Sequence, residues 1–416
     1  MCKHAVFSRY NRDYTIVLRI QVSNGRIAVD KYAVTLAGGG SKGIYQIGAW
    51  KALKELGIEY EAVTGTSIGA INGAFMVQGD LQKAKDMWKN LRMDQCVRLP
   101  ENAGLVSDNL MDRQHAGMIL KEVITHGGID QSPLYYLLVQ YIDISLIYSS
   151  SIDFGLCTYS LRNRSSLKVW RSDIPRDHFF SYIMASSALP GLRSVKLDNH
   201  VYLDGGIGDN LPFDMLRKRG LRNIIAIDLR PAKNRPIATD RLRFTHICNS
   251  LELGGTLDLS PAVLSRNYEL GYLDTRKTFG FYDGIHYYLP VGDYRHLLAF
   301  FDDGVMPGLE QAALLYEMRR DRVYTAEEFL RTLSWCREKA QEQYAVERKK
   351  IDADGIIAAV RNGSLQRLKH MPSDVRLSLL MELMSEVKKN GSKWSIPLSL
   401  FRDVDLAAGA LLHLEP

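Results

Sequence analysis

Residues 60–74, YEAVTGTSIGAINGA, decide the fold, because an apolar run leads into Gly65-Thr66-Ser67-Ile68-Gly69 and then into small residues. The run at 60–64 predicts a strand, and the small residues after it predict a helix. A sharp turn between strand and helix lifts a serine hydroxyl out of the backbone, and flanking glycines avoid steric clashes there. The pattern predicts Ser67 as a nucleophile; the alternative is that Ser67 only caps the helix.

A second glycine-rich turn, Gly38-Gly39-Gly40-Ser41-Lys42-Gly43, stands between a predicted strand at 32–36 and a predicted helix at 43–56. Free N–H groups fixed before a helix are what an oxyanion hole requires. The glycine spacing also fits a dinucleotide site, but the acid that should end the second strand is misplaced, since Glu61 begins that strand. The sequence therefore favours an oxyanion loop, in which Lys42 either tunes the local field or is simply solvated.

A third motif, Asp204-Gly205-Gly206, follows a predicted strand at 201–203. A carboxylate at the end of a strand, beside glycines that let backbone approach closely, is a candidate site residue, although such a motif is also common in turns. We therefore predict Asp204 as the proton acceptor for Ser67.

At these three motifs the sequence resembles the patatin-like phospholipase family, and the segment 185–191, ASSALPG, resembles a family stretch that precedes the catalytic aspartate. The resemblance extends over residues 31–290. It implies a three-layer α/β/α fold and a Ser67–Asp204 dyad in place of a triad. It also implies hydrolysis of acyl esters of phospholipids and related lipids, without a metal or cofactor.

The pattern along the chain predicts an α/β fold with a doubly wound, mostly parallel sheet. Further strands are expected at 151–158, 167–170 and 223–228, with a helix at 211–219 entered through Asn210 as its cap. Residues beyond 304 are helical in pattern and rich in charge. We predict an N-terminal extension or hairpin at 1–30, a phospholipase-like domain at 31–304 and a helical C-terminal unit at 305–416.

Composition narrows the partners. The 53 basic residues against 47 acidic ones leave a net charge of +6, too weak over 416 residues to predict nucleic-acid binding. Basic residues gather at 213–243, which suits either an anionic membrane face or a solvated surface. The five scattered cysteines fit a reducing compartment, and no signal peptide or membrane span is apparent. We expect a cytoplasmic protein with transient, peripheral membrane contact, in which residues 134–147 form a mobile lid or, alternatively, a buried core helix.

The sequence thus predicts a serine acyl hydrolase acting on phospholipids or other acyl esters, in lipid catabolism or as a membrane-degrading effector. One alternative is a ligand-sensing regulatory module with vestigial catalysis. Another is an esterase with a Ser-His-Asp triad, for which the histidines downstream of Ser67 are His200, His246, His286 and His296. A homo-oligomer and an activating ligand are both compatible with the sequence, which identifies neither.

Overall fold

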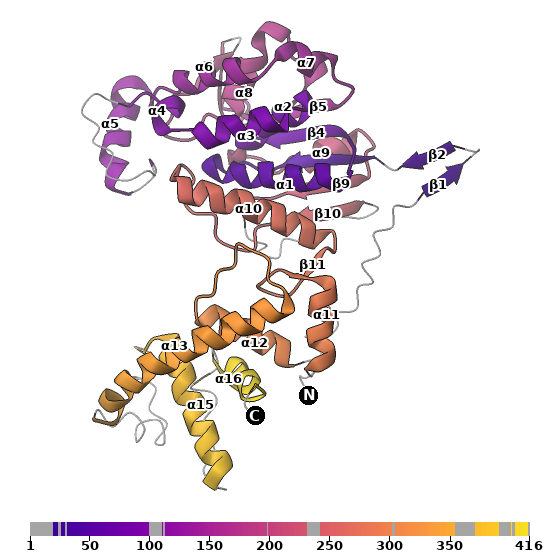
Figure 1. Ribbon diagram of the computed structural model, residues 1–416. Coiled ribbons are helices and arrows are strands. Elements are labelled where there is room, and N and C mark those ends of the chain that lie inside the picture. The colour runs from indigo at the N-terminus through magenta and orange to yellow at the C-terminus, as the bar shows by residue number, and fades with distance from the viewer. Residues whose placement is uncertain are drawn as a thin grey trace. The chain divides into compact units, whose positions relative to one another are not determined.

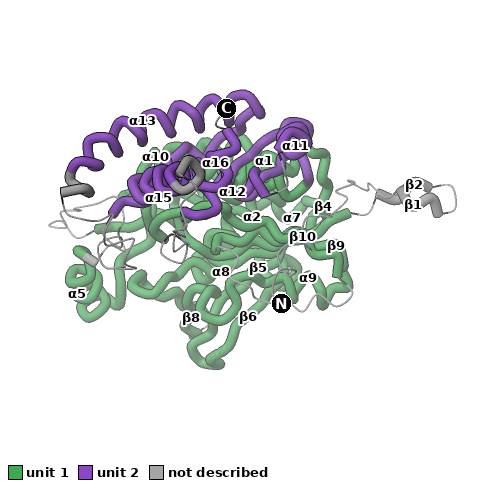
Figure 2. The backbone as a smooth tube through the Cα atoms, turned by 90° about the horizontal axis from the view of Figure 1, so that it is seen from below, with its two compact units in different colours: residues 1–279 green, residues 280–416 purple. Residues whose placement is uncertain are grey.

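The computed structural model describes residues 20–23, 26–29, 31–99, 110, 113–197, 199–230, 242–301, 304–353, 371–390, 401 and 404–414. The chain divides into two compact units, Met1–Phe279 and Gly280–Pro416, which are coloured separately in Figure 2. The predicted boundary at 304/305 differs from this division. Tyr287, Leu289 and Tyr294 lie before residue 304 and are buried in the core of the second unit, so the segment that carries them packs with the C-terminal helices.

The first unit is built on a mixed, mostly parallel sheet of eight strands, ordered β10-β9-β3-β4-β5-β8-β7, with β6 paired to β5. Neighbours from β10 to β5 are parallel, whereas β6, β7 and β8 form antiparallel pairs. The strands are β3 (Tyr32–Leu36), β4 (Tyr60–Thr66), β5 (Asp153–Ser160), β6 (Ser165–Trp170), β7 (Val195–Leu197), β8 (His200–Asp204), β9 (Asn223–Ile227) and β10 (Arg243–Ile247). A separate hairpin, β1 (Ile20–Ser23) and β2 (Arg26–Val29), precedes them.

Helices cover both faces of the sheet (Figure 1). On one face Leu216 of α9 packs against Ala33 and Ala62, and on the other Gly73 of α2 approaches Val63, the next residue along the same strand. Successive side chains of a strand point to opposite faces, so these contacts define two helical layers around one sheet. The helices are α1 (Ile44–Glu55), α2 (Ile68–Gln78), α3 (Leu81–Asn90), α4 (Met93–Cys96), α5 (Ala116–His126), α6 (Ser132–Tyr141), α7 (Ile144–Ser149), α8 (Phe179–Ser186), α9 (Phe213–Lys218) and α10 (Pro261–Thr278). The predicted three-layer α/β/α architecture is confirmed.

The second unit is mainly helical and has its own apolar core, in which Phe329, Leu380 and Phe401 are fully buried. Its elements are β11 (Tyr282–Asp283), β12 (Leu289–Pro290), α11 (Val291–Phe300), α12 (Val305–Leu315), α13 (Ala326–Ala353), α15 (Ser373–Asn390) and α16 (Asp405–Leu412). None of the helices in the described parts of either unit is long and apolar enough to cross a membrane.

Candidate active site

Ser67 occupies a sharp turn between the end of β4 and the start of α2. Its φ of 56° and ψ of −125° are a conformation that residues other than glycine rarely adopt, and such strain is concentrated at functional sites. The side chain makes no capping hydrogen bond to α2, so the alternative of a simple helix cap is wrong. The predicted elbow glycines are sterically required: a Cβ on Gly65 would lie 2.1 Å from the Gly69 carbonyl oxygen, and one on Gly69 would lie 2.4 Å from that of Leu36.

The pairing of β5 brings Asp204 next to this elbow. β6 fills one edge of β5 along residues 155–160, so β4 and β8 must share the other edge. They run toward each other along it, and their last residues, Thr66 and Asp204, oppose the consecutive residues Cys157 and Thr158. Two strands that are far apart in sequence therefore end at adjacent positions, and Ser67 follows directly after one of them.

The Asp204 carboxyl is buried, with 3% of the residue exposed, as is Ser67. Oδ1 accepts a 2.7 Å hydrogen bond from the Gly206 N–H. Burial raises the pKa of Asp204 from 3.8 to about 6, and the nearby Ser67 hydroxyl and the Gly206 N–H limit that rise because they favour the charged form. The two side chains nevertheless make no hydrogen bond of ordinary geometry: within the described structure Oδ2 of Asp204 is buried without a partner. The site thus holds an unsatisfied, weakly basic carboxylate oxygen close to a serine hydroxyl.

The glycine-rich loop leads from β3 into a short 3-10 turn, Gly40–Gly43, that opens α1. The N–H of Gly38 donates to the Asn210 carbonyl, and that of Ser41 donates to the Thr256 carbonyl. Within the described residues the amides of Gly39 and Gly40 make no hydrogen bond. Two free amides therefore remain for an anion.

The hydroxyl of Ser41 and the carbonyl of Gly43 make hydrogen bonds within the protein that keep the loop in place. The Ser41 hydroxyl bonds to the Gly255 and Thr256 carbonyls and accepts from the Asp258 N–H. The Gly43 carbonyl accepts from the Asn72 side chain. Lys42 is half-buried in the 3-10 turn.

The β3–β4 pairing relates the loop to the elbow. Leu36 and Gly65, near the carboxyl ends of these parallel neighbours, are opposite each other. A Cβ on Gly38 would lie 3.1 Å from Cβ of Ser67, so the first glycine of the loop touches the serine. The structure therefore brings together the three predicted motifs at one edge of the sheet.

Two residues of this region make contacts that the sequence-based predictions do not assign to them. The hydroxyl of Ser186, at the end of α8, accepts from the Ser67 N–H at 2.9 Å and donates to the Cys157 carbonyl at 2.7 Å. Asn210, predicted as a helix cap, does not cap α9, which has Pro212 at that position with no side-chain cap bond. Its amide instead donates to the Gly38 carbonyl at 3.1 Å. Only the position of Asn210 a few residues after the Asp-Gly-Gly motif hinted at such a role.

Two of the histidines downstream of Ser67, His200 and His246, lie away from it. His246 is on β10, three strands from β4 in the order β10-β9-β3-β4, which at about 4.8 Å per strand is about 14 Å. Its imidazole lies 3.5 Å from the Asp228 carboxylate. His200 begins β8 and Asp204 ends it, so about 13 Å of strand separates them.

The predicted lid, residues 134–147, spans parts of α6 and α7. Leu137, Leu138 and Ile147 are buried, while Tyr136 is 66% exposed. The segment is thus an amphipathic surface layer rather than a fully buried helix. The neighbouring α5 has no buried residue, and its Leu120, Val123 and Ile124 are exposed, Ile124 by 75%.

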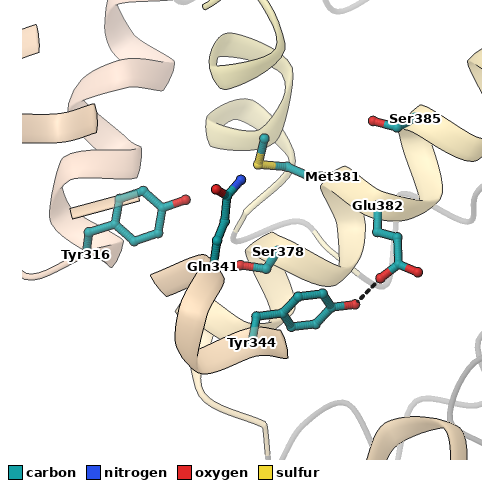
Figure 3. A pocket seen from close by; sticks show the side chains of 7 residues that line it. All are labelled: Tyr316, Gln341, Tyr344, Ser378, Met381, Glu382 and Ser385. Carbon is teal, nitrogen blue, oxygen red and sulfur yellow. Dashed lines mark hydrogen bonds between the residues drawn. The ribbon is translucent and has the colours of Figure 1, made fainter. Parts of the chain in front are cut away.

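Two pockets lie outside this site. A crevice of about 230 Å³ in the second unit lies between α13 and α15, with the side chains of Tyr344 and Glu382 hydrogen-bonded at its rim (Figure 3). Another, of about 390 Å³, opens at the amino ends of the strands near Lys31, Arg222 and Arg243. In the described part of the chain no cluster of three or more His, Cys, Asp or Glu side chains could hold a metal ion.

The part of the chain that carries this site is similar to known proteins. Residues 34–217 match the family model described as patatin-like phospholipase. The chain is 25% identical over 220 residues to patatin-like phospholipase domain-containing protein 7 of Rattus norvegicus, covering 52% of this chain and 14% of that protein. It is 28% identical over 210 residues to lysophospholipase NTE1 of Cryptococcus neoformans, covering 49% and 11%. The chain thus corresponds to a small part of these much longer relatives.

Among solved structures, VipD from Legionella pneumophila covers 93% of this chain and 86% of its own, with a TM-score of 0.40 and 11% identity. The type III effector protein ExoU gives a TM-score of 0.31 and 13% identity, with coverage of 92% and 78%. The family model instead matches a range that contains the elbow, the glycine-rich loop and the Asp-Gly-Gly motif. Through residues 34–217, the chain is thus similar to the patatin-like phospholipase family.

Proposed function

We propose that this protein is a lipid acyl hydrolase in which Ser67 is the nucleophile and Asp204 the general base. The observation that carries the proposal is the buried Oδ2 of Asp204, which has no partner in the described structure and belongs to a carboxyl with a pKa of about 6 beside the Ser67 hydroxyl. Such a carboxylate is ionised at neutral pH and can accept a proton. A buried, unpaired polar atom costs stability and calls for a functional explanation.

The reaction proceeds in two halves. As the Ser67 Oγ attacks the ester carbonyl carbon, its proton passes to Asp204, and the free amides of Gly39 and Gly40 donate to the developing oxyanion. Collapse of the tetrahedral intermediate expels the alcohol, such as a lysophospholipid, which takes the proton from Asp204. Water then attacks the acyl-enzyme carbonyl as Asp204 again accepts a proton. The second tetrahedral intermediate collapses with cleavage of the bond between Ser67 Oγ and the acyl group, Ser67 takes the proton back from Asp204, and the fatty acid leaves. Each oxyanion donor contributes about 10²- to 10³-fold in rate.

The direct test is lipid mass spectrometry after expression of wild type and Ser67→Ala. Lysolipids and free fatty acids should accumulate with wild type and not with the variant, and their head groups would identify the substrate. Ser187→Ala is the matched control, because Ser187 is a buried serine whose hydroxyl donates to the Ile183 carbonyl within its own helix turn. Equal lipid profiles for wild type and Ser67→Ala would refute the hydrolase assignment and favour a ligand-sensing module.

We further propose that α5 and α6 make the transient membrane contact. Their exposed Leu120, Ile124 and Tyr136 offer apolar side chains, which suit the boundary between lipid head groups and acyl chains. Hydrogen exchange of residues 116–141 should slow with anionic vesicles, and Ile124→Glu should weaken vesicle binding. Phe300→Glu, which changes an equally exposed aromatic residue of the second unit, is the control. Unchanged exchange in 116–141 would rule out this contact.

A further inference from the structure

Asn210 is bonded to the glycine-rich loop through both its backbone and its side chain. Its carbonyl accepts from the Gly38 N–H at 3.1 Å, and its Nδ2 donates to the Gly38 carbonyl, also at 3.1 Å. Both backbone polar groups of Gly38, its N–H and its carbonyl, are therefore held by one residue. This fixes the residue immediately before the two amides that remain free, those of Gly39 and Gly40.

The side-chain oxygen of Asn210 fills the space between two motifs. A Cβ on Gly38 would lie 2.7 Å from Oδ1, and one on Gly206 would lie 2.8 Å from it. The asparagine amide therefore lies between the glycine-rich loop and the turn that follows Asp204. Any side chain at either glycine would displace it.

The segment that carries Asn210 is also anchored to the elbow. The Asp209 carbonyl accepts from the hydroxyl of Thr66, the residue before Ser67, at 2.9 Å. The N–H groups of Gly208 and Asp209 return to the Gly205 carbonyl, directly after Asp204. A single short turn, residues 205–210, thus contacts all three motifs, and Asn210 supplies its link to the loop.

We propose that Asn210 is a positioning residue that sets the distance between the free amides of the glycine-rich loop and the Ser67–Asp204 pair. The inference rests on the proposed function and adds to it a residue that touches no reacting atom. Preorganised oxyanion donors are effective only in a fixed place, and a displacement of about 1 Å costs about 100-fold in rate. The amide is required chemically, because a carboxylate cannot donate to the Gly38 carbonyl and adds a negative charge near the developing oxyanion.

The test compares Asn210→Ala and Asn210→Asp in the full chain, assayed with a soluble short-chain ester. We expect kcat to fall about 10- to 100-fold in the alanine variant and further in the isosteric aspartate variant, with KM within about 3-fold of wild type. The acid limb of the pH–rate profile should keep its midpoint in Asn210→Ala, since the loss acts through the loop and not through Asp204. Asn249→Ala is the matched control: Asn249 is a buried asparagine that donates Nδ2 to the Leu251 carbonyl at 2.7 Å.

Two measurements separate this idea from a general loss of structure and from the proposed function. Thermal unfolding should shift equally in Asn210→Ala and Asn249→Ala, while only the former loses kcat. Full kcat in both Asn210 variants, a loss of kcat/KM that comes from KM, or a shifted acid limb in Asn210→Ala would overturn the positioning role. If Ser67→Ala in the same series is as active as wild type, the proposed function fails; if it is inactive while Asn210→Ala is fully active, only the positioning role fails.

Discussion

Two buried carboxylates, one in each unit, are treated in opposite ways. Glu310 of α12 is fully buried and accepts backbone N–H groups from Ile285, His286 and Tyr287 at 2.6 to 3.1 Å. Asp204 is buried nearly as deeply but accepts one backbone N–H, and its second oxygen has no partner in the described structure.

The difference separates a structural acid from a chemical one. The three backbone N–H donors occupy both oxygens of the Glu310 carboxylate and hold residues 285–287 against it. Asp204 keeps an oxygen free beside a serine in a strained backbone conformation. At Asp204 the unsatisfied buried oxygen and the strained backbone of Ser67 occur together, which is where a fold gives up stability for chemistry.

The largest expected effect is that of Asp204→Asn on activity. The asparagine keeps an oxygen for the Gly206 N–H but cannot accept a proton, so kcat should fall about 10³- to 10⁴-fold. Folding should be unchanged or slightly favoured, because a buried charge is removed. Steady-state kinetics together with thermal unfolding measure both. An Asp204→Asn variant with more than a tenth of wild-type kcat would contradict the role of Asp204 as base.

The same change at Glu310 should act on stability instead. Glu310→Gln places an NH₂ group among backbone donors and removes their charged acceptor, which should lower the free energy of unfolding by about 3 kcal/mol. Activity per folded molecule should be unchanged. Urea denaturation measures the first and active-site titration the second. Glu338→Gln, an exposed acid on α13, serves as control; a Glu310→Gln protein as stable as that control would show that the bonds to the turn contribute little.

A smaller effect is the pH dependence of activity. Since Asp204 must be ionised to act and its pKa is about 6, kcat/KM should be constant above that pH and fall about tenfold per unit below it. The measurement is a pH–rate profile between about pH 4.5 and 8 with a soluble ester. A profile flat down to pH 5 would argue against a raised pKa at the base.

Stability should change in the opposite sense. Between pH 3.8 and about 6 the folded state holds a proton on Asp204 that the unfolded state has lost, so the unfolding free energy should fall as pH rises through this window. About two pKa units correspond to about 3 kcal/mol. Asp204→Asn lacks this titration. The difference between the two proteins in unfolding free energy, measured as a function of pH, therefore gives the contribution of Asp204. Parallel curves would show that the carboxyl is not perturbed by burial.

Local sequence patterns predict the elbow and its strands well. The Tyr32–Leu36 strand is confirmed, and the strand predicted at 60–64 extends to Thr66 in the structure. These signals are short-range, because an apolar run or a glycine-rich turn can be recognised from a few consecutive residues. The meeting of β4 and β8 end to end depends on antiparallel pairing with β5, which no local pattern in either strand specifies.

Two further features depend on tertiary contacts. Asn210 reads as a helix cap from its neighbours, but its amide bonds to Gly38, which is remote in sequence. Residues 280–304 read as part of the first domain, yet Tyr294 and Leu297 complete the core of the second unit. In both cases contacts with residues remote in sequence determine the structure, and a single sequence does not reveal those contacts.

The smallest expected effect comes from the histidines, which test whether the dyad is sufficient. Ser67 has a carboxylate beside it, whereas His246 is about 14 Å away across three strands, too far to take a proton from the serine. Single alanine replacements of His200, His246, His286 and His296 should each leave kcat within about 3-fold of wild type, as esterase assays on the four variants would measure. The comparison with Asp204→Asn is informative. If a histidine variant loses activity while Asp204→Asn retains it, the general base is that histidine and not Asp204. The unsatisfied oxygen of Asp204 would then need another explanation.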